Sequence, residues 1–192
     1  SGTSIGDLQA FGLNESTGSD DVVGGEVGTS TLDKGDVMIN GVEVGKTTGT
    51  DAAAKAQAIN AVSDETGVTA DASTRVVYSL DFTAGGSASS VYINGTQLDL
   101  SSGNIGGDIN QAVDHINSNV NGVVASTDDE GYLVLTADSG MDIKVEVSAD
   151  GNFGGFFNAA TGVDDSGAAI GGGASGTTKG TITLATDDGS DI

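Results

Sequence analysis

Apolar and polar positions along the chain follow one pattern twice. Residues 37–44 form two short apolar runs around an Asn-Gly pair, and residues 91–100 do the same. Asn-Gly between apolar runs favours the positive φ angles of a tight turn, so each segment is predicted to be a β-hairpin. The landmarks Ile39, Asn40 and Gly41 recur as Ile93, Asn94 and Gly95, 54 residues later.

A helical pattern follows each hairpin. In the second copy, six apolar residues recur at the spacing of one helical face, which predicts a helix over 108–120. These residues are Ile105, Ile109, Ala112, Val113, Ile116 and Val120. The first copy has a thinner stripe over 51–62, with Thr50 as the predicted N-cap and Gly67 as the stop. After each helix a Gly-Val pair starts an extended run, at 67–68 and 122–123.

The repeated landmarks predict an α+β fold. We expect two tandem β-hairpin/helix/strand units, with additional antiparallel strands contributed by the N- and C-terminal segments. Duplicated units of this kind usually build extended or interacting surfaces rather than a single catalytic pocket.

A shorter repeat lies in the second half of the chain. Residues 131–143 align without a gap on 180–192, with identity at six of thirteen positions. Each copy reads as a strand followed by an Asp-x-Gly turn and the start of a return strand, at 143–147 in the first copy. The second copy stops where that strand would begin, so we expect the chain to belong to a longer protein. The strand at 181–185 is expected to pair near the N-terminal segment.

These patterns divide the chain into four parts. Residues 1–32 are predicted to be a Gly/Ser/Asp-rich N-terminal segment, 33–84 the first unit, 91–147 the second unit, and 148–192 a Gly-rich loop with a return strand. Phe153, Phe156 and Phe157 are expected to anchor this last part on a sheet. Residues 161–178 are predicted to be a flexible loop.

Composition excludes several classes of partner. The net charge is −22 with only six Lys and Arg residues, so nucleic acid and anionic membrane surfaces would be repelled. No apolar run approaches the ~20 residues needed to span a bilayer, so no membrane insertion is expected. The chain has no Cys and therefore neither disulfides nor a thiolate site. The strong self-repulsion predicts a monomer in isolation.

The duplicated residues resemble a known family. The two Ile-Asn-Gly hairpins, the segment 59–68 and its counterpart 116–123 are similar to a motif repeated in the variable outer region of bacterial flagellins. The strand-turn segments at 133–143 and 182–192 are similar to the flagellin sequence segment that follows that motif. The resemblance covers about 36–147 and the last dozen residues. Related motifs occur in hook-associated and filament-cap proteins.

This resemblance implies a structural role. The protein would be a secreted, extracellular component of the bacterial flagellum that serves motility and is not an enzyme. Flagellins join other subunits of the filament through long terminal helices with a heptad pattern, and this sequence contains no such pattern. No residue here is therefore assigned to polymerisation. The resemblance also implies possible O-linked glycosylation of exposed Ser and Thr.

Candidate chemistry is weak in this sequence. Residues 2–6 match the nucleophile-elbow pattern but lack a preceding strand, and His115 is the only histidine. Gly171, Gly173 and Gly176 match a dinucleotide fingerprint but precede a strand rather than a helix. His115 falls on the polar flank of its predicted helix, as a solvated residue would. We predict no catalytic residue and no cofactor.

Acidic pairs support the main alternative. Each acidic group precedes a glycine by one to three residues, and Ca²⁺ favours several oxygens gathered in a turn. These groups are Asp20-Asp21, Asp128-Asp129-Glu130, Asp164-Asp165 and Asp187-Asp188. Asp and Gly are also ordinary turn residues, and no segment has the spacing of a known calcium loop. We predict no metal site. An extracellular adhesin-like or calcium-binding module remains the alternative function. Asn14 and Asn94 head formal glycosylation sequons, although Asn94 is also a predicted turn residue.

Overall fold

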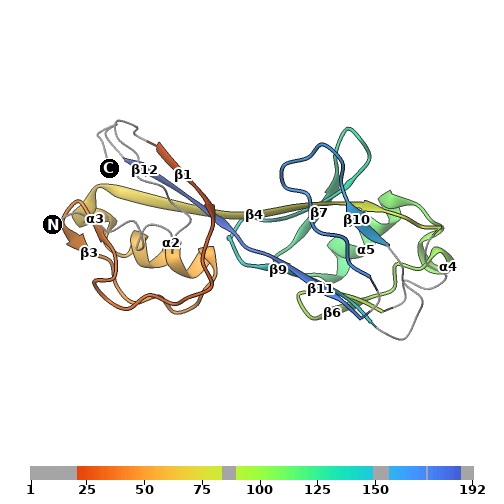
Figure 1. Cartoon of the computed structure of the whole chain (residues 1–192), viewed down its shortest axis with the longest axis horizontal. Coiled ribbons are helices and arrows are strands. Elements are labelled where there is room, and N and C mark those ends of the chain that lie inside the picture. The colour runs from red at the N-terminus through yellow and green to blue at the C-terminus, as the bar shows by residue number, and fades with distance from the viewer. Residues whose placement is uncertain (1–20, 84–89, 149–155, 172, 187–192) are drawn as a thin grey trace. The chain divides into compact units, whose positions relative to one another are not determined.

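The computed structural model describes residues 21–83, 90–148, 156–171 and 173–186, and Figure 1 shows its elements. The chain has an α+β fold, as predicted, with short helices and antiparallel strands in several sheets. It divides into two compact units, each made of discontinuous segments. Among the described residues, unit 1 contains 21–74, 138–142 and 179–186, and unit 2 contains the rest. Each unit holds one copy of the repeat.

Unit 1 is built around a C-terminal strand. Its elements are β1 (Asp21–Glu26), β2 (Met38–Ile39), β3 (Val42–Glu43), α2 (Ala52–Asn60), α3 (Ser63–Thr66), the first half of β4 (Val68–Leu80), and β12 (Thr181–Thr186). Strand β12 lies between β1 and β4 and is antiparallel to both, with Leu184 opposite Val22 on one side and Ala70 on the other. The predicted pairing of this strand with the N-terminal segment is therefore confirmed.

The core of unit 1 is aliphatic. Small residues on α2 allow the helix to pack closely, and Ile59 at its end is fully buried. The core cluster consists of Val27, Leu32, Val37, Ile39, Val44, Ala52, Ala56, Ala58, Ile59, Val68, Ala70, Ile182 and Leu184. Residues distant in sequence thus contribute to one core, to which strand β12 adds Ile182 and Leu184.

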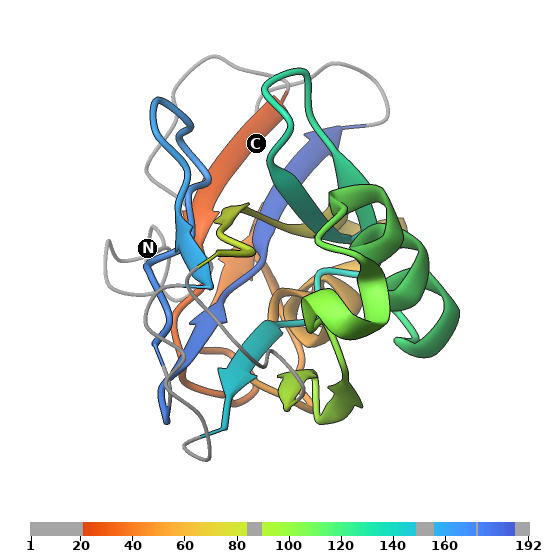
Figure 2. The ribbon, with the colours of Figure 1, turned by 90° about the vertical axis from the view of Figure 1, so that its right-hand side faces the viewer.

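Unit 2 surrounds the second repeat with further strands. Its elements are the second half of β4, β5 (Val91–Ile93), β6 (Thr96–Leu98), α4 (Ser102–Ile105), α5 (Ile109–Asn119), β7 (Val124–Thr127), β8 (Leu133–Ala137), β9 (Ile143–Val147), β10 (Phe157–Ala159) and β11 (Ser175–Thr178). One sheet has the strand order β11-β9-β5-β6, while β4 pairs with β10 and β8 pairs with β7. Helix α5 packs against β7 (Figure 2).

Aromatic residues fill part of the unit 2 core. The buried rings of Tyr78, Phe156 and Phe157 meet edge to face, with centroids 5.3 Å apart for Tyr78 and Phe157 and 5.1 Å for the two phenylalanines. Phe82 meets Phe156 in the same way at 5.6 Å. The expected anchoring of the Phe-rich segment on a sheet is confirmed for β10, while Phe153 lies outside the described residues.

Four local predictions were wrong. Gly67, expected to stop the first helix, caps the separate helix α3, because α2 already ends at Asn60. Ile105, expected on the apolar stripe of the second helix, lies in the separate helix α4. Residues 175–178, expected in a flexible loop, form edge strand β11 opposite β9. Their Ser, Gly and Thr residues carry no apolar alternation, so the pairing depends on β9 rather than on local propensity. The N-cap of α2 is Asp51 rather than Thr50, because the Asp51 carboxylate accepts the Ala54 N–H at 2.9 Å. The predicted turn and return strand after 186 lie outside the described residues.

Candidate functional site

The repeat landmarks occupy equivalent positions in the two units. Asn40 and Gly41 have φ angles of 49° and 81°, and Asn94 and Gly95 have 48° and 80°. Positive φ at both central residues is the signature of a type I′ hairpin turn, which matches the twist of the flanking strands. The preceding isoleucines, Ile39 and Ile93, are both buried. Both predicted hairpins are confirmed by their strand pairing.

The helices of the two copies also correspond. Asp51 caps α2, and Asp108 caps α5 by accepting the Asn110 N–H at 2.9 Å. Fifty-seven residues separate the two caps, and the same number separates the fully buried Ile59 and Ile116. The two copies therefore agree in hairpin, helix and strand order, although the offset between equivalent residues is 54 at the hairpins, 57 at the helix caps and 55 at Gly67 and Gly122.

An asparagine clamp joins each helix to the following strand. The Asn60 side chain donates to the Ala70 carbonyl at 2.8 Å and accepts the Ala70 N–H at 2.7 Å. Asn117 makes the same pair of bonds to Ala125, at 2.9 and 2.8 Å. A side-chain amide here takes the place of a neighbouring strand, so it satisfies both backbone groups on one side of a buried residue.

Sequence reasoning missed this clamp. The repeat comparison aligned Ile59-Asn60 with Ile116-Asn117. The signal available in the sequence was that both helices have an asparagine directly after their last buried isoleucine. The partner alanines follow after ten and eight residues respectively, so their spacing alone would not have revealed the pairing.

One buried charge distinguishes the two copies. Lys55 lies four residues before Ile59 and is completely buried, whereas Ala112 holds the corresponding position before Ile116. The Lys55 ammonium donates to the Gly28 carbonyl at 2.5 Å. Burial lowers the Lys55 pKa from its ordinary value, and the Lys179 charge lowers it further, while Asp142 and Asp51 act in the opposite direction.

This buried lysine predicts a pH-dependent contribution to stability. Its folded-state pKa lies below the unfolded value of about 10.4. Burying the charged lysine therefore lowers the free energy of unfolding fully at pH values below the folded-state pKa. This penalty disappears as pH rises from the folded-state pKa to the unfolded-state pKa. We expect the unfolding free energy of the wild type, minus that of Lys55→Met, to increase with pH in this range. Titrations of groups that do not interact with Lys55, including that of Tyr78, whose pKa burial raises, cancel in the difference. A difference independent of pH would contradict the prediction.

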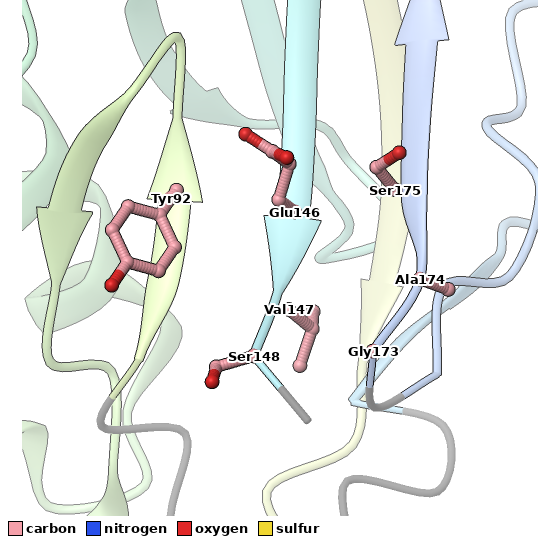
Figure 3. Close-up of a pocket in the computed structure, with 7 residues that line it drawn as sticks. All are labelled: Tyr92, Glu146, Val147, Ser148, Gly173, Ala174 and Ser175. Carbon is pink, nitrogen blue, oxygen red and sulfur yellow. The ribbon is translucent and has the colours of Figure 1, made fainter. Parts of the chain in front are cut away.

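A shallow hollow lies on the outer face of the four-stranded sheet of unit 2 (Figure 3). It has a volume of about 420 Å³ and is lined by Tyr92, Glu146, Val147, Ser148, Gly173, Ala174 and Ser175. Tyr92 and Ser175 each lie opposite Glu146 on the neighbouring strands, so the three side chains form one row across the sheet. Lys144 pairs with Glu146 at 2.8 Å. The row offers hydrogen-bonding groups and one aromatic ring on an open surface.

The other candidate motifs do not form a site in the described part of the chain. Residues 2–6 lie outside the described residues. Gly173 and Gly176 lead into and belong to β11, so no helix N-terminus follows them there, and Gly172 is not described. His115 is half-buried on α5, beside a shallow surface depression that it shares with Asp114 and Gln111.

Two of the acidic pairs, at 128–129 and 164–165, lie in or beside turns, whereas Asp21 begins strand β1. Asp128 accepts the Tyr132 N–H at 2.8 Å, and Asp165 forms an ion pair with Arg75. Within the described residues no group of three or more His, Asp or Glu side chains could hold a metal ion. The side chain of Asp21 and residues 20, 187 and 188 lie outside the description.

We expect calcium to have no specific effect on stability. We expect melting temperatures in EDTA, MgCl₂ and CaCl₂ at matched ionic strength to coincide, because solvated carboxylates are only screened. A specific site would add ~2.7 kcal/mol at a free Ca²⁺ concentration of ~100 times the dissociation constant. A rise seen only with CaCl₂ would contradict this prediction and favour the calcium-binding alternative.

Comparison with known protein families gives no match: no family model matches this chain. Within the described residues no helix is long and apolar enough to cross a membrane.

Proposed function

We propose that this chain is the surface-exposed outer region of the subunit of a bacterial flagellar filament. In this role it is a structural, secreted component that covers the filament, and it has no catalytic function. Subunits would assemble through terminal helices outside this sequence, so the region described here contributes surface rather than polymerisation contacts.

The duplicated unit is the observation that carries the proposal. Both copies have the Ile-Asn-Gly hairpin, an Asp-capped helix, an asparagine clamp and a closing strand after a glycine of positive φ. Residues that resemble the repeated flagellin motif thus hold equivalent structural positions. This agreement supports a common repeated module and is consistent with the resemblance.

Charge and surface chemistry support the same role. The 28 acidic side chains outnumber the six Lys and Arg residues, so copies displayed side by side repel one another and remain soluble. The hollow beside Tyr92 is open and polar, as a solvated outer surface would be.

Fractionation of the source cells tests this proposal. Shearing should release the full-length protein together with the extracellular filaments. Mass spectrometry of the sheared fraction should then find peptides from residues 21–186 among its major components. A strain lacking the gene should lose both the peptides and the filaments. Retention of the protein in the cell envelope after shearing would contradict the proposal and favour an adhesin. Recovery as a trace component would favour a hook-associated or cap protein.

A further inference from the structure

The chain contains three Asn-Gly pairs, at 40–41, 94–95 and 121–122. In an Asn-Gly sequence the backbone nitrogen of glycine can attack the asparagine side-chain carbonyl, because glycine has no Cβ to hinder the approach. The reaction requires the asparagine side chain and the next peptide unit to rotate into contact. A fixed backbone or a held side chain therefore slows it.

The first two pairs are held in their hairpins. Asn40 donates through its side chain to the Thr66 carbonyl at 2.9 Å. Asn94 accepts the Lys144 N–H on its side chain at 2.7 Å, while its own N–H donates to the Lys144 carbonyl at 2.9 Å. Both asparagines have the positive φ of a type I′ turn, so reaction would require the turn to open.

The third pair is in a different environment. Asn121 and Gly122 are both exposed in the bend between α5 and β7, and Asn121 does not have positive φ. Within the described part of the chain no hydrogen bond holds the Asn121 side chain. Gly67 holds the corresponding position in the first repeat, but it follows Thr66, so the first repeat has no Asn-Gly pair at this position.

We propose that Asn121 is a site of spontaneous deamidation and isoaspartate formation in the folded protein. The Gly122 nitrogen bonds to the Asn121 side-chain carbon, ammonia leaves, and a cyclic succinimide forms. Water then opens the ring at either carbonyl to give aspartate or isoaspartate. The net change is one amide and one water converted to one carboxylate and one ammonium ion.

The product changes the connection between helix and strand. Each event adds a negative charge at the surface of the second repeat, and the isoaspartate product also lengthens the backbone directly before Gly122. The buried Val123 and the clamp at Ala125 follow within four residues. Older molecules would therefore differ from newly made ones at one defined position.

Peptide mapping after incubation at mildly alkaline pH tests this inference. Cleavage after Asp and Glu places the three unmodified pairs in separate peptides, namely 37–43, 82–99 and 115–128. An aspartate product adds a cut after the modified residue, whereas an isoaspartate product leaves the peptide whole. In the folded chain we expect position 121 to be the first at which the amide is replaced by a carboxylate. Methylation by an isoaspartyl methyltransferase detects the isoaspartate product. Asn40 and Asn94 should react at least ~10-fold more slowly, the equivalent of an opening free energy of ~1.4 kcal/mol.

Two controls make the outcome decisive. In urea the three pairs should react at similar rates, which shows that the fold protects two of them. Asn121→Gln should remove the modification at 121 in the folded chain, because glutamine cyclises much more slowly. Equal rates at the three positions in the folded chain, or no reaction at 121 while the unfolded chain reacts, would overturn the inference.

Discussion

Replacing Gly140 by alanine should lower the free energy of unfolding by about 2–5 kcal/mol. Gly140 has a φ of +74°, which costs an alanine about 1–2 kcal/mol. A Cβ at this position would also lie 2.4 Å from the Ala72 Cβ and 3.2 Å from the Ala53 nitrogen. Such overpacking typically costs a further 1–3 kcal/mol.

The environment of Gly140 explains why relief of this clash is difficult. The Gly140 carbonyl accepts the Ala53 N–H from the first turn of α2 at 3.2 Å. Thr74 donates to the adjacent Met141 carbonyl at 2.7 Å. The turn before β9 is thus fixed on both sides, and moving it would break these bonds.

Gly131→Ala is the matched control. Gly131 precedes β8 and has a φ of +80°, but a Cβ there would meet no atom within 4 Å. We expect it to lose only the ~1–2 kcal/mol that comes from backbone strain. Urea unfolding of both variants, followed by circular dichroism, measures the difference. Equal losses would show that the contact with Ala72 does not constrain the turn.

Loss of either asparagine clamp should be the second largest effect. Asn60→Ala and Asn117→Ala each remove two hydrogen bonds from a buried alanine, Ala70 or Ala125. Leaving a buried backbone group without a partner costs ~1–3 kcal/mol, although water can reach these exposed asparagine positions. We expect each variant to be ~1–3 kcal/mol less stable than the wild type in equilibrium unfolding.

Asn119→Ala controls for the loss of an asparagine near the end of a helix. Asn119 is exposed on α5 and donates only within its own helix, to the His115 carbonyl at 2.7 Å. Its replacement should change stability by no more than ~0.5 kcal/mol. If all three variants lose the same stability, the amide bonds to the strands contribute nothing specific.

Local signals in the sequence predicted the hairpins and helices well. Asn-Gly pairs determine the turn through backbone conformation alone, and the apolar stripe before Ile116 follows from helical geometry. These features do not depend on distant partners. The helix bounds 51–62 and 108–120 accordingly agree with α2 and α5 to within about two residues.

Features that depend on distant partners could not be predicted in the same way. Strand β11 has polar and small residues and is held by β9, about thirty residues earlier. Each compact unit also combines segments from distant parts of the chain, and no periodicity records such pairing. Lys55 was overlooked because a lysine on a helix is usually solvated, although it lies on the same face as Ile59.

Immunogold electron microscopy of the source cells tests the central proposal most directly. An antiserum raised against the 192-residue chain should label the flagellar filament along its whole length, because every subunit would expose this region. Labelling should be absent in a strain lacking the gene. Gold particles on the cell body rather than on filaments, or only at the filament tip or base, would contradict a role as the outer region of the filament subunit.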